Sequence, residues 1–375
     1  ITRETADPDG GEILRDAAGE PTGMLVDNAV GLVRRAIPAG GGLPTTELWR
    51  IAQEACFRAG LTGVHDAGVP AADVEPLRRL YARGTLKLRV HAMLSAGPGI
   101  EDYLAGHEPR GDARFGVRAL KLYVDGAMGS RGAWLLAPYS DRPGHAGLEV
   151  TPRKRLRALV EAAARGGWQV CAHAIGDRAN REILDLYEAA LKKHPRRAAR
   201  WRVEHAQCLS PADIPRFARL GVIASMQPTH ATSDMRWAEA RVGPERLRGC
   251  YAWRRLLESG ARLCFGSDFP VESERPLWGI HAAVTRQDHR GRPPGGWLPG
   301  QKLGREEALR LFTLDAAYAA FQEQEVGSLE AGKLADFVVL DRDILACPAP
   351  ELLEARVLRT VVGGETVYGG RTSQR

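Results

Sequence analysis

The sequence predicts an α/β fold: a TIM (β/α)8-type barrel that lacks its first strand, followed by a small β unit. Short apolar segments alternate with helical patterns along most of the 375 residues, which is typical of a parallel sheet covered by helices. Polar residues gather just after these segments, as at the C-terminal face of such barrels. Seven strand-like segments occur, and a helical pattern precedes the first of them.

The barrel elements follow one another in regular alternation. The predicted strands cover residues 61–66, 88–95, 117–124, 169–173, 202–205, 222–226 and 262–265. The helical patterns cover residues 46–57, 72–82, 153–165, 178–193, 211–220, 244–258 and 305–321. Because a helix leads into the strand at 61–66, that strand takes the second place in a barrel, and strand one would lie before residue 1.

The last fifty residues differ from the rest. Residues 327–336 are rich in turn formers, 337–340 form a strand-like run, and 357–368 predict a hairpin around Gly363 and Gly364. We therefore divide the chain into a barrel domain, residues 1–325, and a small β unit, residues 326–375. A doubly wound open sheet is the structural alternative, but Gly40, Gly41 and Gly42 follow no convincing strand and give no nucleotide loop.

Composition excludes several classes of protein. The net charge is +6 and the pI about 9.1, but the 52 basic and 46 acidic residues are interspersed, so we expect no nucleic-acid partner. No run of about 18 apolar residues occurs, so we expect no membrane span. The six cysteines form no CxxC pair, and Cys171 and Cys264 lie in apolar strands, which predicts a reduced, cytoplasmic protein.

Four residues could carry chemistry together. Lys121 lies within the strand at 117–124, and His173 and His205 end the strands at 169–173 and 202–205. Asp268 follows the strand at 262–265. In a barrel these positions meet at one mouth. Neutral imidazoles and a carboxylate bind zinc, and a carboxylate can also accept a proton from a water molecule that the metal activates.

Each of the four also has a plain structural interpretation. A histidine at a strand end is more often a hydrogen-bonded structural residue, and an aspartate after a strand is often a helix cap or turn residue. A lysine in an apolar strand needs a partner, so Lys121 could pair with Asp125 or extend to the surface. Their joint placement favours the metal site.

The motifs around these residues resemble the amidohydrolase superfamily, in the branch that includes N-substituted formamide deformylases and exoenzyme-regulator-like proteins. The matching motifs occur in the expected order and are GGEILRD at 10–16 with PTG at 21–23, LKLYVDGAMGSR at 120–131, HAIGD at 173–177, VEHAQ at 203–207, GSDFPV at 266–271 and GSLEAGKLAD at 327–336. Any one of them is weak, whereas the ordered set is specific.

The resemblance implies a TIM barrel with a β-sandwich built from both chain ends, so residues 326–375 would be half of it. It implies one or two divalent ions, usually zinc. His173 and His205 would be ligands, and Asp268 would be both ligand and general base. Lys121 would hold the position that, in a carboxylated form, bridges two ions.

One departure from the family is serious. The family opens its site with a His-x-His pair on strand one, and no such pair occurs among the ten histidines. The missing motif and the missing strand coincide, so we interpret the chain as a fragment or truncated product of such a hydrolase.

Four further residues are weaker candidates. Arg131 follows a glycine-rich turn and would orient a substrate carbonyl or anionic group, although a structural salt bridge is equally compatible. His230 follows the strand at 222–226 and would polarise a substrate carbonyl, or is simply a loop residue. His65 and Asp66 end the first strand and would support the ligands from behind.

The leading hypothesis is a metal-dependent hydrolase of a non-peptide C–N bond, of the amide or formamide type, acting on a small-molecule substrate. The alternative is a non-catalytic fragment or interaction protein, because open strand edges invite pairing with another chain, including a second copy. A phosphate-handling barrel is a weaker third class, since no glycine-rich phosphate loop lies near the last two strands.

Overall fold

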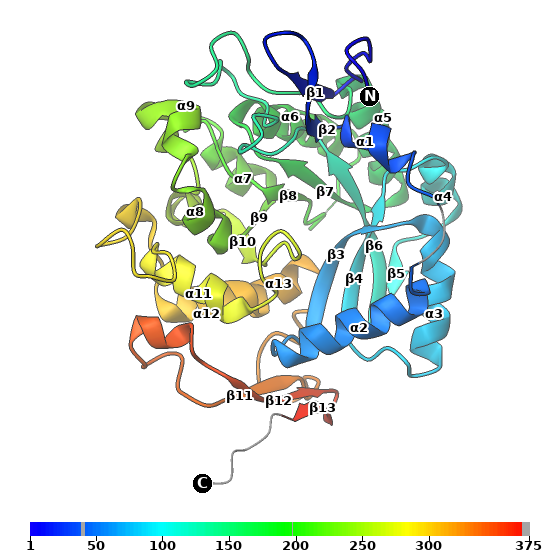
Figure 1. Cartoon of the computed structure of the whole chain (residues 1–375). Coiled ribbons are helices and arrows are strands. Elements are labelled where there is room, and N and C mark those ends of the chain that lie inside the picture. The colour runs from blue at the N-terminus through cyan, green and yellow to red at the C-terminus, as the bar shows by residue number, and fades with distance from the viewer. Residues whose placement is uncertain (39–41, 197, 370–375) are drawn as a thin grey trace.

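The computed structural model describes residues 1–38, 42–196 and 198–369, and its centre is a curved parallel sheet (Figure 1). The strand order is β10-β9-β8-β7-β6-β4-β3. These strands are β3 (Gly63–Val69), β4 (Arg89–Ser95), β6 (Phe115–Tyr123), β7 (Gln169–Ala174), β8 (Arg202–His205), β9 (Ile223–Met226) and β10 (Arg262–Phe265). All seven predicted strands are therefore confirmed. A short strand, β5 (Arg110–Gly111), pairs antiparallel with β6.

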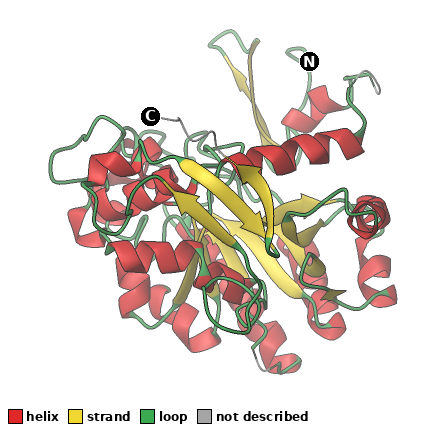
Figure 2. Ribbon diagram, turned by 90° about the horizontal axis from the view of Figure 1, so that it is seen from below, coloured by secondary structure: helices red, strands yellow, loops and turns green. Residues whose placement is uncertain are grey.

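Helices surround the sheet, as the alternation predicts, and Figure 2 shows them outside the strands. They are α2 (Thr45–Arg58), the turn η1 (Ala71–Asp73) with α3 (Val74–Ala82), α4 (Ile100–Gly106), α5 (Arg153–Gly166), α6 (Asp177–Lys193), α7 (Ile214–Leu220) and α10 (Trp253–Glu258). Each buries one apolar face; in α6 this face includes Ile183, Leu184 and Tyr187. The Tyr187 hydroxyl donates to the Arg202 carbonyl at 2.8 Å, which fixes α6 on β8.

The barrel is incomplete, and this part of the fold prediction is confirmed. The sheet ends at β10 on one side and β3 on the other, and within the described ranges no strand joins them. Gly40 and Gly41, discounted above as part of a nucleotide loop, lie outside the described residues.

Two predicted helices were wrong in extent. The pattern at 244–258 is divided between α9 (Ala238–Leu247) and α10, because Tyr251 has a φ of 51° and donates its backbone N–H to the distant Gln207 carbonyl. The pattern at 305–321 is divided into α12 (Arg305–Phe312) and α13 (Leu314–Ala319) at Thr313. Three helices after strands, α4, α8 (Pro228–Asp234) and α11 (Pro276–Thr285), were not predicted.

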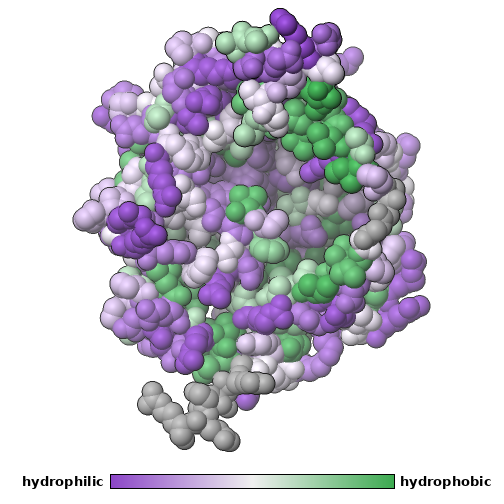
Figure 3. Space-filling view, in the orientation of Figure 1, coloured by the Kyte–Doolittle hydropathy of each residue, from purple (hydrophilic) through white to green (hydrophobic). Residues whose placement is uncertain are grey.

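The N-terminal segment forms a hairpin of β1 (Gly11–Arg15) and β2 (Pro21–Asp27), followed by the short helix α1 (Val30–Arg34). Six large apolar side chains are exposed on α1, on α2 and on the segment between them; they are Val30, Val33, Ile37, Leu43, Leu48 and Ile51. Figure 3 shows apolar side chains gathered over α1 and α2, beside a face that is hollowed at its centre.

The C-terminal sheet is antiparallel, with order β11 (Phe337–Leu340), β12 (Val357–Val362) and β13 (Glu365–Gly369), and the predicted hairpin at 357–368 is present. Two short 3-10 helices, η2 (Pro299–Gln301) and η3 (Ala349–Leu352), lie in the connections before it and within it. A buried pair of Arg89 and Asp336 fixes this sheet to the barrel, with Nη2 2.8 Å from Oδ1. The division at residue 325 stays a prediction.

Cys208 and Cys250 form a disulfide, whereas Cys56, Cys171, Cys264 and Cys347 are free. The expectation that all six cysteines are reduced is therefore wrong for this pair, because the break between α9 and α10 brings Cys250 beside Cys208. The cytoplasmic location rested on that expectation and stays a prediction. Across the described ranges, no helix is both long and apolar enough to cross a membrane.

Candidate metal centre

Three side chains that could bind a metal ion meet where three neighbouring strands end. His205 ends β8, His230 lies on α8 directly after β9, and Asp268 follows β10. One donor atom from each lies within 4.8 Å of the others. Nε2 of His230 is 3.6 Å from Oδ2 of Asp268, and the rings of His205 and His230 are 5.8 Å apart. Two imidazoles and one carboxylate form a common donor set for zinc.

The backbone at two of these strand ends is left-handed. The φ angles are 75° at His205, 42° at Ala206 and 60° at Asp268. Residues other than glycine rarely adopt this region, and such positions cluster at functional sites. The chain therefore turns sharply after β8 and β10, just where these strands deliver His205 and Asp268 to the mouth.

Both histidines are held neutral by their surroundings. Burial lowers the pKa of His205 to about 3, and the nearby Lys121 adds to this effect. Burial also lowers the pKa of His230 to about 3, with a further contribution from His205. A neutral imidazole keeps a nitrogen lone pair free for a metal ion. Burial raises the pKa of Asp268 to about 6, while the charge of Lys121 opposes the rise.

The hydrogen bonds around the histidines fit a metal ion. Nδ1 of His205 lies 2.8 Å from Oε1 of Gln227, which leaves Nε2 of His205 available. Nε2 of His230 is buried and finds no hydrogen-bond partner within the described ranges. A buried nitrogen without a partner is costly, and a metal ion would supply a partner for Nε2 of His230. In metal-binding histidines the nitrogen that does not bind the ion commonly makes a hydrogen bond, as Nδ1 of His205 does with Gln227. The donor set therefore fits a divalent ion.

His173 lies beside this group but faces partly away from it. Its ring is 4.6 Å from that of His205, edge to face. Its Nε2 lies 3.5 Å from Oδ1 of Asp125 and 3.5 Å from the Gly126 carbonyl oxygen. Burial holds the pKa of His173 well below its usual range, so this imidazole is neutral as well.

Lys121 is buried in β6, with an exposed fraction of 3%, so it does not extend to the surface. Its Nζ lies 4.5 Å from the centre of the Tyr123 ring. Asp125, the partner that the sequence suggested for Lys121, accepts backbone N–H groups from Trp134, Ile175 and Gly176 instead. Burial lowers the pKa of Lys121, and the charges of Glu204 and Asp268 oppose that change.

The other predicted site residues have different surroundings. Arg131 donates to both carboxylate oxygens of Asp141, at 3.0 and 2.9 Å, so its guanidinium is engaged in a salt bridge. Nδ1 of His65 lies 2.8 Å from Nη1 of Arg202, which also pairs with Glu204 inside the half-barrel. Asp66 is exposed on β3.

From the sequence we expected His230 to contact the substrate, whereas it lies within the candidate metal group. Gln227 was not among the residues predicted from the sequence. The available signal was position: both residues directly follow the strand that became β9, as the other candidates follow theirs.

Comparisons with known proteins agree with this architecture. The chain is 34% identical to the Bacillus subtilis protein YtcJ over 98% of its own length and 70% of that protein. It is 30% identical to the N-substituted formamide deformylase of Arthrobacter pascens, over 98% of this chain and 69% of the deformylase.

A solved structure is also similar. An uncharacterized metal-dependent hydrolase from Pyrococcus horikoshii superposes with a TM-score of 0.73 and 31% identity, over 81% of this chain and 61% of that one. The chain thus spans about three fifths of that hydrolase. The sequence model of the amidohydrolase family matches residues 1–368. The motifs predicted this relationship, and the chain belongs to the amidohydrolase family.

Proposed function

We propose that this chain carries the metal-binding part of a hydrolase that cleaves a non-peptide C–N bond in a small amide or formamide. The observation that carries the proposal is the meeting of His205, His230 and Asp268 at adjacent strand ends. The relatedness to an N-substituted formamide deformylase supports the choice of bond. Zinc is the proposed ion, and Lys121 and His173 stay predicted ligands, of the same ion or of a second one.

Each residue has a distinct part in the proposed reaction. A divalent ion held by this group would polarise the substrate carbonyl and lower the pKa of a water molecule. The Asp268 carboxylate, whose pKa is raised to about 6, would accept a proton from that water and pass it to the leaving nitrogen. Gln227 would keep the His205 ring oriented through its 2.8 Å contact with Nδ1.

A second candidate function rests on the open sheet. β3 and β10 end the strand order without pairing to each other in the described part of the chain. Unpaired strand edges bind further strands, so the chain could instead act as an interaction protein or assemble with a second copy.

The test combines metal content with turnover. The purified chain is loaded with zinc, its metal content is measured, and amine release is followed from a panel of N-alkyl formamides and small amides. We expect stoichiometric zinc in the wild type and its loss in His205→Ala and His230→Ala. Asp268→Asn should lower kcat by about 100-fold or more.

His107→Ala, a change to an exposed histidine stacked on Tyr103, is the matched control and should keep both zinc and activity. A chain that binds no zinc, or whose turnover is unaffected by Asp268→Asn, contradicts the proposal. Stoichiometric zinc without turnover on any substrate favours the interaction protein.

A further inference from the structure

The disulfide between Cys208 and Cys250 is close in sequence to the candidate metal centre. Cys208 follows His205 by three residues, and Cys250 lies between α9 and α10. The two segments run antiparallel: Tyr251 donates its N–H to the Gln207 carbonyl, and Leu209 donates to the Gly249 carbonyl at 3.0 Å. The disulfide therefore closes a pairing that holds the segment after β8.

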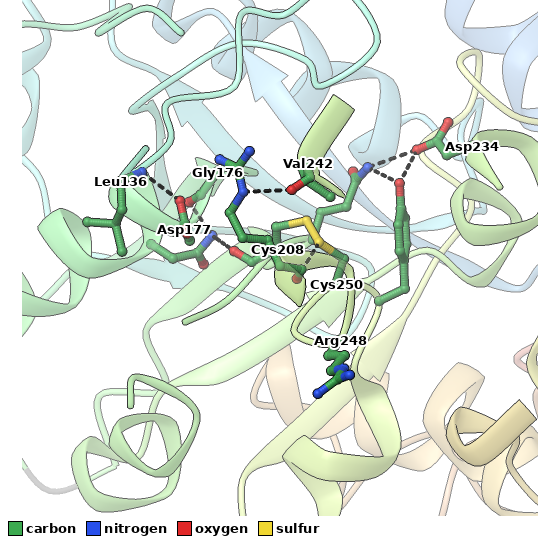
Figure 4. Close-up of a disulfide and its surroundings, with 12 residues drawn as sticks. Leu136, Gly176, Asp177, Cys208, Asp234, Val242, Arg248 and Cys250 are labelled. Carbon is green, nitrogen blue, oxygen red and sulfur yellow. Dashed lines mark hydrogen bonds between the residues drawn. A yellow bond between two sulfur atoms is a disulfide. The ribbon is translucent and has the colours of Figure 1, made fainter. Parts of the chain in front are cut away.

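A cavity of about 230 Å³ reaches one of the two sulfur-bearing residues. Its walls come from the segment after β8, from α9, from the start of α6 and from Leu135. Cys208 is among them, whereas Cys250 is not. Figure 4 shows the disulfide between Asp177 on one side and Asp234 on the other, with Val242 above it. A small molecule in the cavity would therefore meet Cys208 first.

The surroundings of the cavity suit exchange with a thiol. The Arg246 guanidinium donates to the carbonyls of Val242, Ala137 and Pro138 and forms no salt bridge in the described part of the chain. The carboxylates of Asp177 and Glu245 line the same cavity, so the charge of Arg246 offsets theirs where a small, uncharged thiol loses its proton. Sγ of Cys250 lies 3.5 Å from the Arg246 carbonyl oxygen. That oxygen can accept the S–H of Cys250 once the disulfide opens.

The same two segments also hold the helix that bears His230. Asp234, at the end of α8, accepts hydrogen bonds from Gln207 at 2.8 Å and from the Tyr251 hydroxyl at 2.7 Å. Gln207 and Tyr251 are the direct neighbours of Cys208 and Cys250. Opening the disulfide would loosen this pair of donors, and the end of α8 would lose this attachment, while α8 stays packed against α11.

We propose that Cys208–Cys250 is a thiol-exchange site for small thiols. Opening of this disulfide loosens α8 and, with it, the positions of the His205 and His230 imidazoles. The thiolate of the small thiol bonds to Sγ of Cys208, and the Cys208–Cys250 bond breaks. Cys250 leaves as a thiolate and takes a proton from water. A second thiol attacks the mixed disulfide, which releases reduced Cys208 and the oxidised small thiol. Only the effect on metal binding rests on the proposed function.

The first experiment uses the wild-type chain. Alkylation after unfolding without reductant should label four of the six cysteines, and all six after reduction. Hydrogen–deuterium exchange of the native chain should then show α8 exchanging about tenfold faster after treatment with 2-mercaptoethanol, while α5 stays unchanged. Six labelled cysteines without reductant, or no change in α8, overturns the proposal.

The second experiment asks which sulfur the cavity serves. Cys250→Ser leaves Cys208 free, and Cys208→Ser leaves Cys250 free as its matched control. With 2-hydroxyethyl disulfide, peptide mass analysis should find the adduct on Cys208 forming about tenfold faster than the adduct on Cys250. Glutathione disulfide, which is larger than the cavity, should react more slowly with Cys208. Equal rates at the two sulfurs contradict the role of the cavity.

Zinc binding separates this proposal from the proposed function. The oxidised chain should bind zinc about tenfold more tightly than the reduced chain. Equal affinities overturn the link to the metal centre. If neither form binds zinc, the proposed function fails. The exchange at Cys208 is still tested by the rate of adduct formation and by the hydrogen–deuterium exchange of α8.

Discussion

At the scale of single residues, Gln227 is the side chain on which the orientation of His205 depends. It is buried beside the metal group, its Oε1 lies 2.8 Å from Nδ1 of His205, and its Nε2 donates to the Ser225 carbonyl. We expect Gln227→Ala to weaken zinc binding by about 10- to 100-fold, because the imidazole loses its fixed orientation. Gln301→Ala, in the surface turn η2, is the control. Zinc titration measures both, and equal affinities would show that Gln227 has no such part.

The sequence reveals which residues end strands but not how their side chains turn. Lys121, His173, His205 and Asp268 all end up around one mouth, since the ends of parallel strands converge. That Nε2 of His173 faces Asp125 depends on contacts between β7 and the segment after β6. His230 was not predicted in the metal group for a different reason: α8 has the sequence PTHATSD, whose few apolar residues give no helical periodicity.

At the scale of elements, the C-terminal sheet depends on one buried ion pair. Asp336 accepts two bonds from Arg89 and one from the Gly363 N–H at 2.7 Å, and both charged side chains are about 95% buried. Asp336→Ala leaves the guanidinium of Arg89 buried without a charged partner, with only the Ala113 carbonyl to accept from it. We expect a loss of about 3–5 kcal/mol in the free energy of unfolding, measured with urea.

Glu330→Ala offers a matched control in the same turn. Its carboxylate is exposed and lies 4.0 Å from Lys333, so its loss should change stability by less than about 0.5 kcal/mol. Similar losses for the two variants would mean that the sheet is held mainly by other contacts, such as the bond from Thr360 to the Phe57 carbonyl.

Element boundaries show where local pattern stops being informative. Residues 244–258 have a continuous helical pattern, yet the helix breaks where Tyr251 donates to Gln207, over forty residues away. Helix boundaries set by such distant partners cannot be derived from periodicity. The hairpin at 357–368 was predictable because its turn is local and Gly363 and Gly364 supply the positive φ angles.

At the scale of the whole molecule, the order of the sheet followed from the alternation alone. Each helix returns the chain to the same end of the sheet, so strands that are neighbours in the sequence become neighbours in space. What the pattern could not show is the polar interior of the half-barrel, where His65, His91, Arg202 and Glu204 come together. The contact between His65 and Arg202 joins residues 137 positions apart.

That interior should make the whole chain sensitive to acid. His91 has an exposed fraction of 2%, and its Nε2 lies 3.0 Å from Oε1 of Gln169. Burial lowers the pKa of His91 to about 4, and the charge of Arg202 adds to this. In the unfolded chain the pKa is about 6.5, so that state takes up a proton first as the pH falls. The contribution of neutral His91 to the free energy of unfolding is therefore fully present above pH 6.5 and is lost as the pH falls towards 4. The whole loss is about 3 kcal/mol.

The comparison that checks this uses His91→Gln, which keeps a polar side chain but cannot titrate. We expect the free energy of unfolding of the wild type to fall more steeply between pH 7 and pH 4.5 than that of the variant, whatever their difference at pH 7. His107→Gln, at an exposed histidine, controls for the loss of a ring. Parallel curves for wild type and His91→Gln would place the origin of acid sensitivity elsewhere, for example at His281, whose pKa burial also lowers to about 4.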